Sequence, residues 1–225
     1  MNHVVVTGGT GALGAAVVEV LLARGATVHL PIMEAALPAH LPWRDRVHAV
    51  PGVSLEREAD VVTFYAGLPA LWASIHLVGG FAMAPVTETS LADFEKQWRL
   101  NTATCFLACR EAVRRMGETK AGGRIVNVAA RPAVTPTAGM IAYATAKAGV
   151  AALTHALAAE VLSQGILVNA VLPSIIDSAA NRAAMPKADH ASWPKPAQLA
   201  ETIAFLAREQ NALTTGTLVP VYGRA

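Results

Sequence analysis

Tyr143 and Lys147 are the side chains best suited to carry out chemistry in this 225-residue chain. A spacing of four residues places both on one face of a helix, one turn apart. A phenol has a pKa of about 10 and is a poor acid or base near neutral pH until a nearby cation stabilises its phenolate. An ammonium group one turn away supplies that cation and can also reach a sugar hydroxyl. The pattern Tyr-x-x-x-Lys is common, however, and by itself it favours a surface pair without a function.

A glycine-rich segment near the start of the chain adds a second motif. Gly9, Gly11 and Gly14 satisfy the pattern G-x-G-x-x-G between a Val-rich run and an Ala/Val-rich run. Glycines let the backbone turn tightly and approach a pyrophosphate, whose charge is favoured at a helix N-terminus. A plain glycine-rich turn is the alternative, and the strand–turn–helix context makes it the weaker one. The residues expected to bind the cofactor here are Gly8, Gly9, Thr10, Gly11, Ala12, Leu13 and Gly14.

Short β-rich runs alternate with longer helical stretches, which predicts a parallel sheet covered by helices on both faces. We expect one α/β domain over residues 1–225, a doubly wound parallel sheet of the Rossmann type with about seven strands. The predicted strands are His3–Thr7, Thr27–Leu30, Arg46–Val50, Ser74–Val78, Arg124–Val128, Leu167–Leu172 and Leu218–Val221. The predicted helices are Ala12–Arg24, Leu55–Ala73, Ser90–Met116, Ile141–Ser163 and Lys195–Glu209. The stretch Pro31–Arg44 is too short and Pro-broken for a full crossover helix.

Composition narrows the class of protein. Hydrophobic residues make up 53% and charged residues 15%, which favours a large core over disorder. A net charge of +2 without a basic tract predicts neither nucleic acid nor an anionic membrane as a partner. The N-terminus lacks a signal-type segment, and no apolar run reaches the roughly 20 residues of a membrane span, so a cytoplasmic location is expected. Cys105 and Cys109 read as small core or interface residues of one helix, with no neighbouring ligands to complete a zinc site, and no metal is predicted.

The motifs occur in an order and spacing that resemble the short-chain dehydrogenase/reductase superfamily over essentially the whole chain. Besides the glycine segment and the Tyr-x-x-x-Lys pair, the resemblance includes the strand at Gly123–Val128 and Leu100-Asn101 on the preceding helix. It continues through Val171-Leu172-Pro173 after the sixth strand and Thr215-Gly216 before the last strand.

The resemblance implies an NAD(P)(H)-dependent oxidoreductase that transfers hydride to or from a small carbonyl or quinonoid compound. Tyr143 would exchange a proton with the substrate, Lys147 would lower the tyrosine pKa and bind the nicotinamide ribose, and Asn101 would hold a water in a proton relay. Residues 174–196 would form a lid over the substrate. Members usually pair through their long helices, so a homodimer or homotetramer is expected. The further cofactor contacts implied are Gly79, Gly80, Pro173 and Ile176.

Two regions depart from the superfamily pattern. Ala130 stands where a serine usually orients the substrate carbonyl. After the second strand, Pro31, Ile32 and Met33 stand where an NAD-preferring site places an acid, and Glu34 comes slightly late. The choice between NAD and NADP is therefore open, with a slight preference for NADP because nothing would repel its 2′-phosphate.

The dihydropteridine reductase-like branch shows similar departures, and the chain resembles it in Gly79-Gly80-Phe81 and Gly139–Tyr143. That branch lacks the serine and reduces a quinonoid pterin, so a pterin-like compound is one candidate substrate. The alternative function is a non-catalytic nucleotide-binding or scaffolding protein derived from such an enzyme. Ala130 favours that alternative, whereas the retained Tyr143 and Lys147 oppose it.

Several side chains keep two interpretations at this stage. Phe81, Met83, Met185 and Trp193 would give the substrate site apolar walls, and a role in the core or in subunit contacts explains them equally well. Arg131, next to the missing serine, would bind an anionic group of the substrate or form a structural ion pair.

Overall fold

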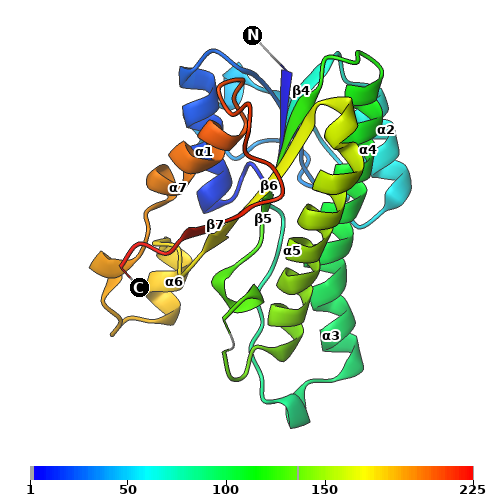
Figure 1. The fold of residues 1–225 in the computed structure, drawn as a ribbon. Coiled ribbons are helices and arrows are strands. Elements are labelled where there is room, and N and C mark those ends of the chain that lie inside the picture. The colour runs from blue at the N-terminus through cyan, green and yellow to red at the C-terminus, as the bar shows by residue number, and fades with distance from the viewer. Residues whose placement is uncertain (1–2, 136, 225) are drawn as a thin grey trace.

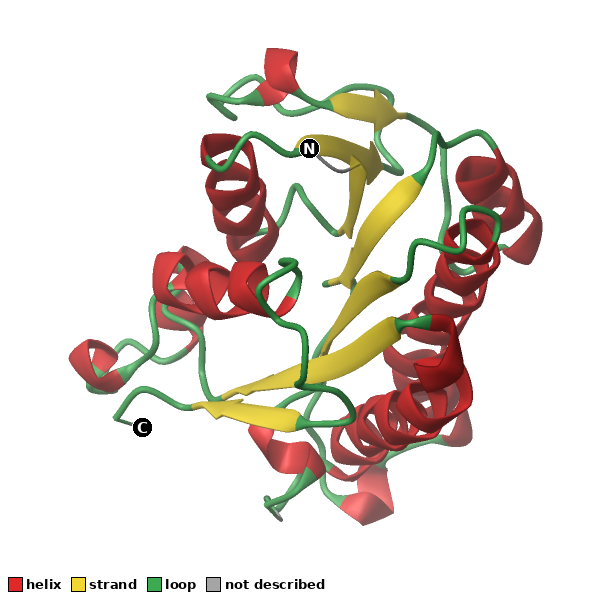
Figure 2. Cartoon of the chain, turned by 45° about the horizontal axis from the view of Figure 1, so that its top comes forward, coloured by secondary structure: helices red, strands yellow, loops and turns green. Residues whose placement is uncertain are grey.

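The computed structural model describes residues 3–135 and 137–224. These residues form one seven-stranded sheet in the order β3-β2-β1-β4-β5-β6-β7. Every neighbouring pair of strands is parallel. Helices lie on both sides of the twisted sheet (Figure 2). The predicted doubly wound, Rossmann-type architecture is therefore confirmed.

The boundaries of the elements are as follows. The strands are β1 His3–Thr7, β2 Thr27–Pro31, β3 His48–Val50, β4 Leu71–His76, β5 Gly123–Val128, β6 Ile166–Pro173 and β7 Leu218–Val221. The α-helices are α1 Ala12–Ala23, α2 Glu58–Ala66, α3 Leu91–Trp98, α4 Thr104–Gly117, α5 Ile141–Val161, α6 Ala179–Ala184 and α7 Pro196–Leu206.

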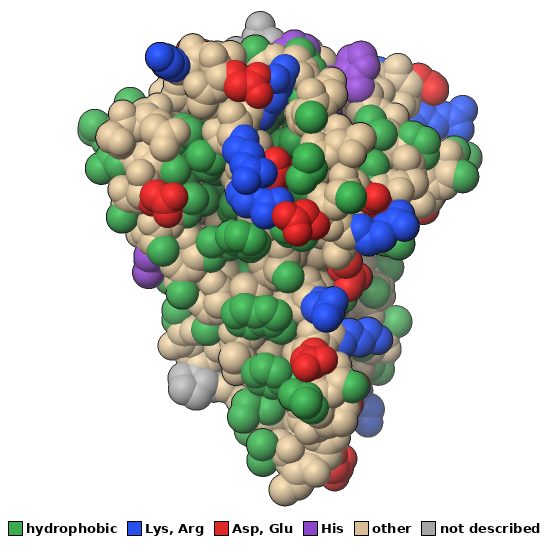
Figure 3. All heavy atoms as spheres, turned by 90° about the vertical axis from the view of Figure 1, so that its right-hand side faces the viewer, with side chains coloured by type: hydrophobic (Ala, Val, Ile, Leu, Met, Phe, Trp, Pro, Cys, Tyr) green, Lys and Arg blue, Asp and Glu red, His purple; other side chains and the backbone are tan. Residues whose placement is uncertain are grey.

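Two apolar layers hold the helices on the sheet. Helices α1 and α7 pack side by side on one face, and α2, α4 and α5 cover the other (Figure 1). The central strands supply apolar side chains to both layers, which explains why β6 is buried along its whole length. The outer surface of the α2–α4 layer carries interspersed basic and acidic side chains (Figure 3), among them the Arg110–Glu58 ion pair at 2.7 Å. Within the described residues, no helix has the length and apolar character needed to cross a membrane.

The helix predicted over Leu55–Ala73 is wrong in length. Helix α2 ends at Ala66, and β4 begins inside the predicted helix, at Leu71. Gly67 occupies the C-cap position of α2, and Pro69 cannot continue a helix because it lacks an N–H group. Both signals of the break, Gly67 and Pro69, are present in the sequence, and the predicted helix ran through them.

The helix predicted over Ser90–Met116 is interrupted. A π-helical turn at Arg99–Ala103 separates α3 from α4. No glycine or proline in this stretch signals the interruption. Such turns insert one extra residue into a helix and occur frequently at functional sites.

The segment 174–196 contains α6 and a short 3₁₀ turn at His190–Ser192. The backbone of Asp177 donates a hydrogen bond to the carbonyl of Pro194 at 3.0 Å, which ties the two ends of the segment together. The Trp193 side chain is buried, so its part in the fold is packing. Phe81 and Met83 are exposed, as a wall of an open substrate site requires. That the segment closes over a substrate stays a prediction.

Candidate active site

The turn between β1 and α1 needs glycine at two positions for reasons internal to the protein. Gly8 has φ +69°, a conformation that side chains with a Cβ rarely adopt. A Cβ at Gly14 would lie 2.0 Å from the carbonyl oxygen of Gly8, so α1 can pack against the turn only when residue 14 is glycine. The predicted glycine segment therefore forms the tight strand–turn–helix connection that its pattern indicates.

Gly11 is different, because the protein itself leaves room beside it. A Cβ there would have only ordinary contact, at 3.5 Å, with the carbonyl of Gly8. Gly11 is the exposed N-cap residue of α1, no side chain caps this helix, and its first turn carries no acidic residue. The open space and the uncapped N–H groups fit the pyrophosphate of a dinucleotide. When bound, NAD(P)(H) would lie against Gly11, Ala12 and Leu13 and supply hydride chemistry at its nicotinamide end.

Asn101 lies in the π-helical turn and is fully buried. Its side-chain amide donates to the carbonyl of Gly80 at 3.0 Å, and its Oδ1 accepts from the N–H of Gly80 at 3.2 Å. The same amide also donates to the carbonyl of Gln97 at 2.9 Å. Asn101 therefore fixes the loop after β4, and these contacts occupy the side chain that the resemblance assigned to a water relay.

Lys147 is buried on α5 and reaches the same loop. Its Nζ donates a hydrogen bond to the carbonyl of Val128 at 2.8 Å. A Cβ at Gly79 would lie 3.1 Å from this Nζ and 2.5 Å from Oδ1 of Asn101, so Gly79 must be glycine. Burial lowers the pKa of Lys147 to about 8. The structure thus brings together Lys147, Asn101 and Gly79 from three separate segments.

Tyr143 stands one turn before Lys147, at the start of α5, and is half-buried. Its ring meets the edge of Phe81 at a centroid distance of 5.0 Å and an angle of 82°. Burial raises the pKa of Tyr143 to about 12, whereas a lowered pKa was expected from Lys147. The difference has a simple cause, since the ammonium group of Lys147 is directed at the carbonyl of Val128. In this state the phenol keeps its proton near neutral pH.

Ala130 and Arg131 lie two and three residues after the end of β5. Ala130 is buried, and its methyl group offers no hydrogen bond to a substrate carbonyl. The guanidinium carbon of Arg131 lies 5.0 Å from the ring centroid of Tyr222, a cation–π contact. Arg131 therefore contacts the C-terminal segment, and binding of an anionic substrate group by this residue stays a prediction. Of the two expected nicotinamide contacts beyond β6, Pro173 is buried at the strand end, and the carbonyl of Ile176 accepts from Asn181 at 2.8 Å.

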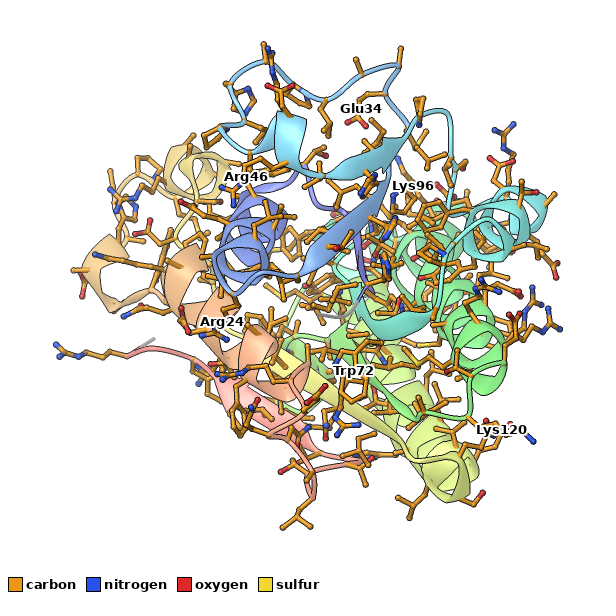
Figure 4. The ribbon with its side chains drawn as sticks, turned by 90° about the horizontal axis from the view of Figure 1, so that it is seen from above. Arg24, Glu34, Arg46, Trp72, Lys96 and Lys120 are labelled. Carbon is orange, nitrogen blue, oxygen red and sulfur yellow. The ribbon has the colours of Figure 1, made fainter. Side chains whose placement is uncertain are left out.

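The carboxyl ends of β2 and β3 lie beside an open cavity. Ile32 is buried, whereas the Met33 side chain is 71% exposed. Glu34 lies on the connection between β2 and β3 (Figure 4). A cavity of about 400 Å³ beside this connection is lined by Ile32 and Arg44, among other residues. Sequence reasoning missed Arg44, since only its place in the irregular Pro31–Arg44 stretch could have drawn attention to it.

Comparison with known proteins yields a clear family match. A family model described as short chain dehydrogenase matches residues 2–189. An uncharacterized short-chain type dehydrogenase/reductase of Sinorhizobium fredii is 30% identical over 98% of this chain, which spans 43% of that relative's length. The 3-beta-hydroxysteroid dehydrogenase of Comamonas testosteroni is 30% identical, with 94% of this chain and 91% of the relative covered. The NADPH-bound structure of a short chain oxidoreductase from Pseudomonas aeruginosa PAO1 containing an atypical catalytic center is 25% identical. It has a TM-score of 0.87 and covers 99% of this chain and 95% of its own.

Proposed function

This chain is an oxidoreductase of the short-chain dehydrogenase family, and on that premise we propose that it transfers hydride between NADP(H) and a small carbonyl or quinonoid compound, with Tyr143 as the proton donor. The observation that carries the proposal is the arrangement around Gly79. Lys147 and Asn101 both meet this loop, and Tyr143 lies one turn away on the same helix as the lysine. A scaffolding protein would have no need for a buried lysine one helix turn from a tyrosine at such a loop.

The chain's own residues have separate tasks in the proposed reaction. The uncapped first turn of α1 binds the pyrophosphate, and Lys147 donates to the ribose next to the nicotinamide. Asn101 keeps Gly79 and Gly80 in place, so that the loop supports the cofactor without side chains in its way. Bound NADPH supplies the hydride. Tyr143, protonated because burial raises its pKa to about 12, gives its proton to the oxygen or nitrogen of the reduced substrate.

Ala130 limits the substrate class. With a methyl group in place of a hydroxyl, residue 130 donates no hydrogen bond that would help Tyr143 to orient a carbonyl. A quinonoid or pterin-like ring, which is held by its flat apolar surface, depends less on such a donor. The exposed Phe81 and Met83 are suited to this contact. The name of the Pseudomonas protein, with its atypical catalytic center, is consistent with catalysis without the usual set of residues.

Preference for NADP follows from the open end of the cleft. No acidic side chain follows β2 directly. Arg44 lines the neighbouring cavity together with Asp45, to which it is paired at 3.5 Å. The pair is exposed and therefore weak, so Arg44 stays available to a 2′-phosphate. An arginine there favours the 2′-phosphate, while an acid would repel it. The NADPH bound by the similar Pseudomonas oxidoreductase agrees with this choice.

The test is a titration of the protein with NADPH and, separately, NADH, following the fluorescence of the bound nicotinamide. Turnover is then measured with a quinonoid dihydropterin and with a panel of small ketones. We expect tighter binding of NADPH and faster turnover of the quinonoid compound. No binding of either cofactor would contradict the proposal and favour the scaffolding function instead.

We also infer that two copies of the chain associate through the α3–α5 side, as members of this family usually do. Trp98 on α3 and Phe106 on α4 are 44% and 46% exposed, and burial of their apolar surface would favour association. Light scattering combined with size-exclusion chromatography should give a mass of at least two chains, reduced to one chain by Phe106→Glu.

A further inference from the structure

A cluster of potential metal ligands lies near Lys147 and has no part in the proposed reaction. It consists of His76 at the end of β4 and of Cys105 and Cys109, one turn apart on α4. All three side chains are buried, and one ligand atom from each lies within 4.8 Å of the others. Both cysteines are free thiols. The residues come from two elements that the sequence separates widely, which is why the cysteine pair looked isolated there.

The spacing of these atoms approaches that of a tetrahedral metal site. Sγ of Cys109 lies 3.4 Å from Nδ1 of His76. Zinc–sulfur and zinc–nitrogen bonds of about 2.3 and 2.0 Å at a tetrahedral angle place the two ligand atoms about 3.5 Å apart. Oδ1 of Asn127 accepts hydrogen bonds from the same Nδ1 at 2.8 Å and from the same Sγ at 3.4 Å. When a metal replaces these two protons, Oδ1 becomes free to be a fourth donor, with its distance from Nδ1 opening by about 0.5 Å. The three ligand atoms lie within 4.8 Å of one another, and two sulfurs bound to one zinc lie about 3.8 Å apart, so the cluster would need to contract by about 1 Å or less.

Neighbouring hydrogen bonds hold the ligands toward the centre of the cluster. Nε2 of His76 lies 2.8 Å from Oγ of Ser74, which in turn lies 2.8 Å from the hydroxyl of Tyr65. Nδ2 of Asn127 donates to Thr154 at 3.0 Å, so its Oδ1 faces the histidine. Because Oδ1 of Asn127 can only accept, Nδ1 carries the proton in the metal-free protein and Nε2 accepts from Ser74. When Nδ1 binds a metal, the proton moves to Nε2, which then donates to Ser74. Partners of this kind fix the ring and tautomer of a metal-binding histidine.

We propose that His76, Cys105, Cys109 and Oδ1 of Asn127 bind one thiophilic divalent cation, with Zn²⁺ as the natural ion. Two thiolates, an imidazole and an amide oxygen suit Zn²⁺ better than the oxygen-seeking Mg²⁺ or Ca²⁺. Each thiol loses its proton to solvent on binding, so one Zn²⁺ replaces two protons and the site gains no net charge. The ion would link β4, β5 and α4 one turn after Asn101, and would so brace the helix that carries it.

The test is a titration of the reduced protein with Co²⁺, which reports thiolate ligands through a sulfur-to-cobalt charge-transfer band. We expect one equivalent to bind with release of two protons, and Zn²⁺ to displace the cobalt. Cys105→Ala and Cys109→Ala should abolish the band. Ser74→Ala should keep it but weaken binding roughly 10- to 100-fold, because the histidine loses its orienting partner.

A control variant tests whether a histidine outside the cluster contributes to cobalt binding. His3→Ala removes one member of the His3–His29 pair, whose ring nitrogens lie 2.9 Å apart at the far end of the sheet, and should leave the band unchanged. Because the cluster is buried, the titration is repeated on protein refolded in Co²⁺, with both thiols counted after unfolding. A native protein with two reduced thiols and no band would overturn the proposal, and so would a band that persists in Cys109→Ala.

Discussion

The two ends of the cofactor cleft are built differently. Where the nicotinamide would lie, the polar side chains have fixed partners: Asn101 holds Gly80 through two hydrogen bonds, and Lys147 holds the carbonyl of Val128. Where the adenosine would lie, the connection after β2 has the 71% exposed Met33 and an open cavity beside Arg44. The side chains at the first end are held by contacts within the protein, whereas those at the second end are exposed and would make their contacts with a bound ligand.

This difference indicates which properties each end controls. Groups that move protons or hydride must be held within a fraction of an ångström, and rigid partners provide that precision. Choice between two cofactors needs only a modest difference in affinity, which a few exposed side chains can supply. We therefore expect substitutions at the nicotinamide end to have large effects on rate and those at the adenosine end to have small effects on preference.

Tyr143→Phe should have the largest effect. Removing the phenolic proton while keeping the ring should lower kcat about 10³-fold and leave the Kd for NADPH nearly unchanged. Steady-state turnover and the fluorescence titration measure the two quantities. A variant that retains the native kcat would rule out Tyr143 as the proton donor.

Two variants of the turn between β1 and α1 should affect different properties: Gly14→Ala the stability of the fold, and Gly11→Ala the binding of the cofactor. A Cβ at Gly14 would meet the carbonyl of Gly8 at 2.0 Å, so we expect a loss of about 3 kcal/mol in the free energy of unfolding. Gly11→Ala has room for its Cβ and should unfold like the native protein, but it should bind NADPH more weakly. Urea unfolding with and without NADPH distinguishes the two. Equal destabilisation by both variants would contradict the assignment of Gly11 to the ligand.

Much of the site could be predicted because it follows from local patterns. The glycine turn and the Tyr143–Lys147 pair each lie within one connection or one helix turn, and strand β1 has the bounds that its Val-rich run indicates.

Contacts between distant segments could not be predicted in the same way. Three features depend on how segments pack in three dimensions. They are the hydrogen bonds between Asn101 and Gly80, the short distances from His76 to two cysteines, and the π-helical turn between α3 and α4. The direction of the pKa shift of Tyr143 has the same origin. Burial, which the sequence does not reveal, outweighs the effect of a lysine that points elsewhere.

A row of three histidines on β1, β2 and β3 predicts how the stability of the protein changes in acid. The rings of His3, His29 and His48 lie side by side across these strands, with centroid distances of 5.1 and 5.0 Å. Burial, with smaller contributions from the two neighbours, lowers the pKa of His29 from 6.5 to about 4.

The unfolded chain therefore takes up a proton at His29 below pH 6.5, while the native protein takes it up only near pH 4. Stability should fall between these two values and then level off. We expect a loss of about 2 kcal/mol, less than the full linkage value because His29 lines an open cavity. Urea unfolding at pH 7 and pH 4.5 measures it, and His29→Leu should remove most of the difference. An identical loss in His29→Leu would assign the acid sensitivity to other groups.

Met33→Asp should have the smallest effect. A carboxylate after β2 would repel the 2′-phosphate and accept hydrogen bonds from the ribose of NAD, shifting the ratio of the two kcat/KM values about tenfold toward NADH. Met33→Asn is the matched control, because it has nearly the same shape without the charge and should shift the ratio little. An unchanged ratio in Met33→Asp would mean that the adenosine lies away from this connection.

The π-helical turn at Arg99–Ala103 also sets the rotational phase between two helices. Its one extra residue offsets α4 from α3 by about 100° around a nearly common axis. Helix α3 packs mainly against α5, whereas α4 packs against β4 and α2. A single continuous rod would present the same stripe of side chains along its whole length. Because of the offset, α3 and α4 turn different faces toward the rest of the protein. Asn101 lies in the turn where the buried face changes.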